Sequence, residues 1–131
     1  AAALVKALED GAWEVRRDAA DALKEAFGSD LGVPAKSKVA EAFVEVLEDP
    51  AWEVRISAAE ALKGTFRSGL DVAAKGKVAA ALVKALEDGA WEVRRDAADA
   101  LKEAFGSDLG VPAKSKVAEA FVEVLEDPAW E

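Results

Sequence analysis

Pairs of adjacent acids recur along the chain, and two neighbouring carboxylates are a combination that can do chemistry. The pairs are Glu9-Asp10, Glu48-Asp49, Glu87-Asp88 and Glu126-Asp127. Carboxylates held together can perform acid–base catalysis or bind a hard cation. An active site, however, is one asymmetric arrangement, whereas this pair returns at a constant spacing along the whole chain. Capping of helix starts and the helix dipole explain the acids better, so we expect neither catalysis nor a metal site.

Other side chains on which catalysis depends are missing from the sequence. The 131 residues include no His, no Cys and no Tyr. The chain therefore lacks the commonest general base and metal ligand, and it has no thiolate. It also has no Gly-rich phosphate-binding motif. We predict that the protein is not an enzyme and has no cofactor.

The charge balance argues against two classes of partner. The formal net charge is −9, from 26 acidic and 17 basic residues. A protein that binds nucleic acid or an anionic membrane normally carries a basic patch. No apolar run approaches the roughly 18 residues of a membrane span, and no signal peptide opens the chain. We expect a cytoplasmic protein without nucleic-acid or membrane partners.

A second recurring motif, Trp-Glu-Val-Arg, combines two residue types that are frequent at binding hot spots. One interpretation is therefore a ligand contact that is repeated along the chain. The other is structural, because Trp13, Ala20 and Phe27 are spaced seven apart and extend the apolar flank of one helix. This spacing favours the structural interpretation. In it, the seam between neighbouring repeats is filled by Trp13, Trp52 and Trp91.

Both motifs belong to an internal repeat. Residues 1–53 are identical to residues 79–131, which is an offset of 78 residues. Inside this unit lies a second, less exact repeat with half that offset. The looser repeat has a period of 39, and a period of about 20–50 residues is typical of solenoids. We predict one segment over residues 1–131, with repeat junctions near 10/11, 49/50, 88/89 and 127/128. Neither end resembles a capping repeat, so we expect an excerpt of a longer array, or copies that associate end to end.

Each 39-residue unit contains two amphipathic stretches, in which apolar residues recur with the period of an α-helix. The first helix is expected over about residues 13–27 and the second over about residues 35–48. Asp49-Pro50 is typical of a helix start, with Asp as the cap and Pro in the first turn. No strand pattern competes, so the predicted fold class is all-α.

Residues 47–62 carry the pattern Leu-Glu-Asp-Pro-x-x-Glu-Val-Arg-x-x-Ala-Ala-x-Ala-Leu. This pattern resembles a HEAT repeat and is similar to the short bacterial subtype named after the phycobilisome lyases. The resemblance implies a right-handed α-solenoid of antiparallel helix pairs, with first helices on the convex side and second helices on the concave side. It also implies a ladder of bonds between neighbouring repeats. The ladder positions are Asp10, Arg16, Asp49, Arg55, Asp88 and Arg94.

The second helices carry the other candidate site. Lys6, Glu45, Lys84 and Glu123 occupy one position in successive repeats, so opposite charges are expected to face each other between neighbouring second helices. A series of ion pairs and a partner-binding surface are both compatible with this pattern. The residues expected to contact a partner on the concave face are Lys38, Glu41, Val44, Glu45, Lys77, Val83, Lys84, Lys116, Glu119, Val122 and Glu123.

The leading interpretation is a non-catalytic HEAT-like scaffold that binds another protein or peptide along this concave face. Regular repetition suits many weak contacts that act together. An alternative is a purely structural or engineered repeat array that stacks end to end. A third interpretation, suggested only by the name of the subtype, is a chromophore-lyase-like subunit. The missing Cys, His and Tyr count against it.

Overall fold

The computed structural model describes residues 2–25, 32–67, 70–104 and 111–126, and over these ranges it contains helices and no strand. The all-α prediction is therefore confirmed. The first helices of the repeats are α2 (Trp13–Leu23), α4 (Trp52–Leu62) and α6 (Trp91–Ala104). The second helices are α1 (Ala2–Ala7), α3 (Val33–Val46), α5 (Val72–Ala85) and α7 (Val111–Leu125), and a short 3-10 helix, η2 (Thr65–Arg67), follows α4.

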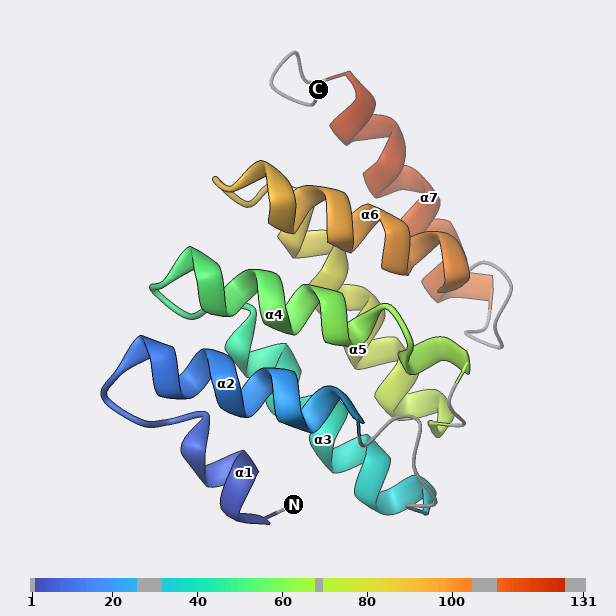
Figure 1. Ribbon diagram of the computed structural model, residues 1–131. Helices are drawn as coiled ribbons and strands as arrows, with labels where there is room; N and C mark the ends of the chain where they lie inside the picture. The colour runs from blue at the N-terminus through green and yellow to red at the C-terminus, as the bar shows by residue number, and fades with distance from the viewer. Residues whose placement is uncertain (1, 26–31, 68–69, 105–110, 127–131) are drawn as a thin grey trace.

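The helices stack in two layers (Figure 1). In one layer α2 packs against α4 and α4 packs against α6, and in the other α3 packs against α5 and α5 against α7. Between the layers, α1 contacts α2, α3 contacts α4, and α5 contacts α6. Because each repeat is covered mainly by its neighbours in sequence, the arrangement is the predicted α-solenoid.

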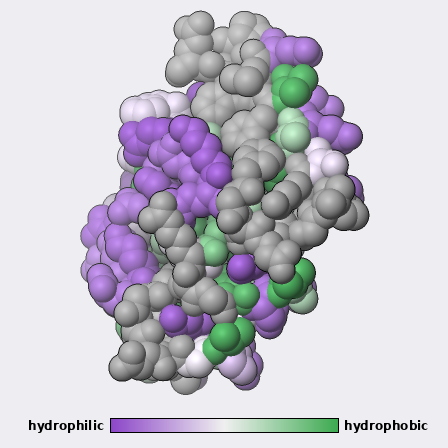
Figure 2. Space-filling model, turned by 90° about the vertical axis from the view of Figure 1, so that its right-hand side faces the viewer, coloured by the Kyte–Doolittle hydropathy of each residue, from purple (hydrophilic) through white to green (hydrophobic). Residues whose placement is uncertain are grey.

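The core lies between the two layers and receives the apolar flank of every repeat. Its largest fully buried side chains include Phe43, Leu62, Leu82, Val93 and Leu101. Many buried residues in α4 and α6 are alanines, which let neighbouring first helices approach closely. The outer side of the first helices is hydrophilic, and Figure 2 shows a continuous purple area there, at the left of that view.

The start of each first helix differs from the prediction. Asp49 is not the cap of α4, because the N-cap is Ala51 and makes no side-chain capping bond. The Asp49 carboxylate instead accepts a hydrogen bond of 2.9 Å from the backbone N–H of Ala51, which holds the turn before the helix. Pro50 lies in that turn, outside the first helical turn. The equivalent acids Asp10 and Asp88 make the same bond.

The remaining boundaries agree approximately with the expected ranges. α2 ends at Leu23, short of the expected Phe27, and residues 26–31 lie outside the described part. α3 begins at Val33, slightly before the expected start, because Pro34 is compatible with the first turn of a helix. No described helix is long and apolar enough to cross a membrane.

The repeat provides an internal comparison of one residue in two environments. Val15 in α2 and Val93 in α6 occupy the same position of identical sequences. Val93 is fully buried in α6, which packs against α4, whereas Val15 is 41% exposed in α2, which has no preceding first helix in the described chain. The neighbouring repeat, and not the local sequence, therefore decides whether this side chain is buried.

We expect Val93→Ala to lower the free energy of unfolding by about 2 kcal/mol, because it removes two buried carbon atoms and leaves a cavity. Val15→Ala makes the same change in the same local sequence and should cost less than about 1 kcal/mol. Chemical denaturation of the two variants checks this difference. Equal losses would contradict the role assigned to the neighbouring repeat.

Candidate protein-interaction site

Bidentate ion pairs connect the junctions of neighbouring repeats. Arg16 donates from Nε to Oδ2 of Asp49 over 2.7 Å and from Nη2 to Oδ1 over 3.0 Å. Arg55 makes the same pair of bonds to Asp88, at 2.9 and 3.2 Å. The side chains are 8–19% exposed, so these pairs are partly shielded from water. The hydrogen bond from Arg16 to Asp49 also raises the pKa of Arg16 above its ordinary value.

Each ladder arginine also binds the backbone of its own junction. Nη1 of Arg55 donates to the carbonyl oxygen of Asp49 over 2.8 Å, and Arg16 and Arg94 bind the carbonyls of Asp10 and Asp88 in the same way. The guanidinium of Arg16 or Arg55 therefore holds the turn of its own repeat and the carboxylate of the next. The Asp127 position, at which the next junction begins, lies outside the described residues.

The expectation that tryptophans fill the seam is wrong for Trp52 and Trp91. Their side chains are 48% and 53% exposed, and Trp13 is half-buried. Each Trp is the first residue of its helix and so lies at the end of the seam, whereas fully buried Ala20 and Ala59 lie along the first helices. Trp13, at the same position, still packs against the core. The Arg95 guanidinium lies 5.2 Å from the centre of the Trp91 ring, a cation–π contact at the surface.

Ion pairs also join neighbouring second helices, but their register differs from the expected one. Lys84 on α5 pairs with Glu48, just past the end of α3, at 2.7 Å, and not with Glu45 at the equivalent position. Lys77 lies 3.8 Å from Glu41. In both pairs the partners are 36 positions apart, which is three fewer than the repeat period. The pairs are therefore offset by about one helical turn, so that each lysine meets the residue three positions beyond the one at its equivalent position.

The strongest electrostatic effect on this face comes from the shorter pair. The hydrogen bond between Lys84 and Glu48 lowers the pKa of Glu48 and raises the pKa of Lys84. Both side chains are largely exposed, at 76% for Lys84 and 66% for Glu48. Exposed pairs of this kind contribute little to stability, so they leave both groups available to a partner.

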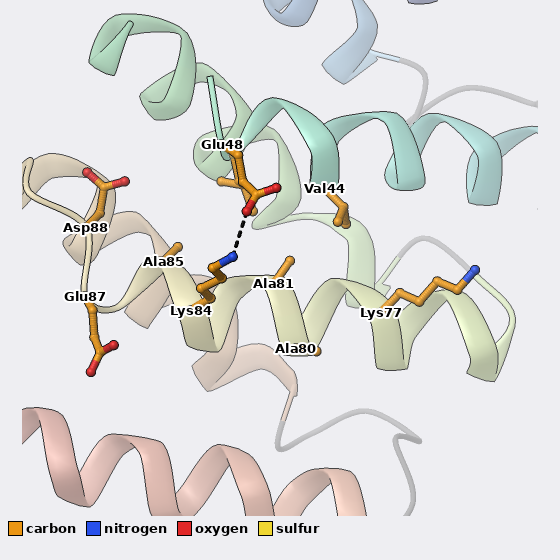
Figure 3. Close-up of a pocket in the computed structure, with 10 residues that line it drawn as sticks. Val44, Glu48, Lys77, Ala80, Ala81, Lys84, Ala85, Glu87 and Asp88 are labelled. Atoms are coloured by element: carbon orange, nitrogen blue, oxygen red, sulfur yellow. Dashed lines mark hydrogen bonds and ion pairs between the residues drawn. The ribbon is translucent and has the colours of Figure 1, made fainter. Parts of the chain in front are cut away.

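A groove of 520 Å³ lies between α3 and α5, and we call it the α3/α5 groove. Figure 3 shows Val44 on the α3 side, Ala81 on the α5 side, and the ion pair from Glu48 to Lys84 joining the two sides. Leu47, Ala80 and Ala85 complete most of the apolar lining. Because small alanines line much of it, the groove can accept an apolar side chain of a ligand.

A smaller hollow of 220 Å³ lies one repeat earlier, between α1 and α3, and we call it the α1/α3 hollow. Each residue of its lining has its equivalent, one repeat further along the chain, in the lining of the α3/α5 groove. These residues are Val5, Leu8, Glu9, Ala42, Glu45, Val46 and Asp49. The concavity therefore follows from the repeat and is not an accident of one side chain.

The structure brings together some of the residues that the sequence nominated on the second helices. Val44, Lys77 and Lys84 line the α3/α5 groove, and Glu45 lines the α1/α3 hollow. The others are distributed along the layer: Lys38 and Glu41 are exposed on α3, Val83 is half-buried on α5, and Lys116, Glu119, Val122 and Glu123 are exposed on α7.

The alanines of the groove lining were missed by sequence reasoning. Ala80, Ala81 and Ala85 form much of this lining on the α5 side. A usable signal was Ala80, which stands where the preceding second helix has the acidic Glu41. A small apolar residue in place of a charged one marks a position where the helix surface is both open and apolar.

Ion pairs between the first helices were also missed. Lys24 pairs with Glu60 at 2.9 Å, and Lys63 pairs with buried Asp96 at 3.3 Å. The partners lie 36 and 33 positions apart, so the shifted register would have been needed to find them.

Comparison with known families decides the classification. The family model for HEAT repeats matches residues 1–76 and 40–131, which together span the chain. The chain belongs to the HEAT-repeat family. The resemblance to HEAT repeats implied a ladder of bonds between neighbouring repeats. The bonds from Arg16 to Asp49 and from Arg55 to Asp88 are two such bonds.

The HEAT repeats also resemble a solved structure. A crystal structure described as that of an engineered protein superposes with a TM-score of 0.72 at 27% sequence identity. The match covers 94% of this chain and 52% of the engineered protein, so the HEAT repeats span about half of its length. No protein with a curated description matches the sequence.

We expect Arg55→Ala to lower the free energy of unfolding by about 2 kcal/mol, because it removes charge-assisted bonds that are partly buried. A double-mutant cycle with Asp88→Ala should give a coupling energy of at least about 1 kcal/mol. The exposed pair of Lys84 with Glu48 is the control and should show a smaller coupling. If the two cycles gave equal values, the ladder would not be the stronger joint.

The Lys24–Glu60 pair predicts a dependence of stability on pH. Its hydrogen bond lowers the pKa of Glu60 below the ordinary value of 4.5. The stability that the ionised Glu60 carboxylate contributes to the folded protein is therefore fully present above pH 4.5. It is lost as the pH falls through the lowered pKa of Glu60. We expect the stability difference between the wild type and Glu60→Gln to shrink as the pH falls below 4.5. Urea unfolding over this range measures it, and a constant difference would refute the assignment.

Proposed function

We propose that this chain is a non-catalytic scaffold that binds another protein or peptide along its second helices. The α3/α5 groove carries the proposal. Its volume of 520 Å³ lies within the range of about 300–1,000 Å³ that ligand sites occupy. An apolar side chain of the partner occupies the space above Val44 and Ala81, and the exposed Glu48 and Lys84 bind its polar neighbours.

The distribution of charged groups supports a scaffold in preference to a catalyst. Ion pairs connect neighbouring repeats in the same way at successive junctions, as for Arg16 with Asp49 and Arg55 with Asp88. Such groups are occupied in holding the repeats together. In the described part of the chain, no group of three or more acidic, His or Cys residues is placed to hold a metal ion.

A second candidate function is a purely structural repeat of engineered origin. The observation that favours it is the likeness to an engineered protein, together with the identity of residues 1–53 and 79–131. Assignment to the phycobilisome-lyase-type subtype is a finer proposal, which rests on the pattern of residues 47–62. Neither proposal conflicts with a binding groove.

Selection from a random peptide library on the immobilised protein tests the proposed function. We expect selected peptides to bind Ala81→Glu at least about tenfold more weakly than wild type, a loss of about 1.4 kcal/mol, because a carboxylate then occupies the apolar groove. Ala98→Glu, on the layer of first helices, is the matched control, since Ala98 is also half-buried. It should retain binding within about twofold.

Circular dichroism and thermal melting of both variants show whether the fold is kept. Selected peptides that bind wild type and Ala81→Glu equally well would place the binding surface elsewhere. Peptides that lose binding to Ala81→Glu and to Ala98→Glu alike would have the same consequence.

A further inference from the structure

Equivalent positions of the α3/α5 groove and the α1/α3 hollow carry different charges. The apolar parts correspond, with Val5 in place of Val44 and Ala42 in place of Ala81. The difference lies at the rim, where the hollow has Glu45 at the position that Lys84 takes in the groove. Asp49 and Asp88 pair with arginines of the ladder, so the remaining charged lining is Glu9 and Glu45 in the hollow, and Glu48, Glu87, Lys77 and Lys84 in the groove.

Of the three acids that line the hollow, Asp49 is paired with Arg16, whereas Glu9 and Glu45 are not neutralised by the described part of the protein. Glu9 and Glu45 are exposed, and neither forms an ion pair within the described residues. Their separation along the chain is the one that brings Glu48 to Lys84 in the groove. Both carboxylates line one hollow, where like charges repel each other and a cation from a partner is favoured.

The longer period of the sequence repeats the acidic pair on the other side of the groove. Glu87 and Glu123 are the copies of Glu9 and Glu45, and both are exposed. Figure 3 shows Glu87 pointing away from the pair formed by Glu48 and Lys84. Along the second helices the charge therefore alternates between the acids Glu9 and Glu45, the Glu48–Lys84 pair, and the acids Glu87 and Glu123, of which Glu87 also lines the α3/α5 groove.

We infer that the occupant of this face is an extended basic peptide segment whose cationic side chains flank one apolar side chain. This inference rests on the proposed function and adds the chemistry of the partner. The apolar side chain binds in the α3/α5 groove, and one Lys or Arg on each side binds an acidic pair. Complementary charge, with a net protein charge of −9, favours this pattern over a neutral or acidic one.

The spacing of the pattern follows from the packing of the helices. Neighbouring packed helices lie about 8–10 Å apart. A chain in the extended polyproline II conformation advances about 3.1 Å per residue and has three residues per turn, so one step between neighbouring sites corresponds to about three residues and every third side chain lies on the same face. The segment is therefore Lys-x-x-Leu-x-x-Lys or its arginine equivalent.

Three synthetic peptides test the pattern against the full chain. All have Leu at the centre and small uncharged residues between, and they carry Lys, Gln or Glu at both outer positions. Fluorescence anisotropy at low salt should show that the Lys peptide binds at least about tenfold more tightly than the Gln peptide. The Glu peptide should bind more weakly than both.

A charge exchange locates the effect. Glu45→Lys gives the hollow the rim that the groove already has, and lysine already occupies this position as Lys84. We expect it to weaken the Lys peptide about tenfold and to leave the Gln peptide within about twofold. Glu14→Lys, at an exposed position of α2, changes the net charge equally and should weaken the Lys peptide much less. If Glu45→Lys lowers the melting temperature, Glu45→Gln replaces it. We expect Glu45→Gln to weaken binding of the Lys peptide too, but to a smaller extent.

The outcomes separate the inference from the proposed function. If Glu45→Lys and Glu14→Lys weaken the Lys peptide equally, only the net charge attracts it and the inference is overturned. If the Gln peptide binds as tightly as the Lys peptide, and both are lost in Ala81→Glu, the groove binds ligand but the basic pattern is wrong. If none of the three peptides binds, the inferred basic pattern is wrong. The selection from the peptide library then still tests whether the α3/α5 groove binds a ligand.

Discussion

The bidentate bond between an arginine of one repeat and an aspartate of the next is the constraint on which the rest of the structure depends. Arg16 and Arg55 each hold the backbone of their own junction and the carboxylate of the following one. A planar guanidinium that makes bonds in two directions defines distance and orientation together. The partners are 33 positions apart, because each arginine lies six positions after the aspartate of its own junction and binds the equivalent aspartate of the next repeat.

An offset of three positions in the ion pairs determines the surface of the second helices. Residues 36 positions apart face each other there, which pairs Lys84 with Glu48 and leaves Glu45 opposite Glu9. Small side chains at the facing positions leave space between the helices, and the α3/α5 groove results where Ala80, Ala81 and Ala85 coincide. The groove is thus a consequence of register and side-chain size acting together. Because the layer of second helices repeats, the α1/α3 hollow and the α3/α5 groove are lined by equivalent positions. Because the two sub-repeats alternate, these positions carry different charges.

The tryptophans show where local reasoning failed. Each Trp is the first residue of its helix, and at this position Trp52 and Trp91 are largely exposed while Trp13 packs against the core. Whether a side chain is buried depends on how far the neighbouring element extends, and a helical wheel carries no information about position along the axis. The same limit applies to Val15 and Val93, which have identical local sequences and opposite exposure because only α6 is covered by a preceding first helix.

The sequence by itself determined the helices, the repeating unit, the α-solenoid class and the membership of the HEAT-repeat family. These follow from periodicity, which is a local property of the chain. It also nominated Val44, Lys77 and Lys84 individually. Only the tertiary structure decided that these residues surround one groove, that Lys84 pairs with Glu48 and not with Glu45, and that Asp49 serves an arginine and a turn instead of capping α4. The reason is that register between repeats is set by packing across the seam, which joins residues that lie far apart in the sequence.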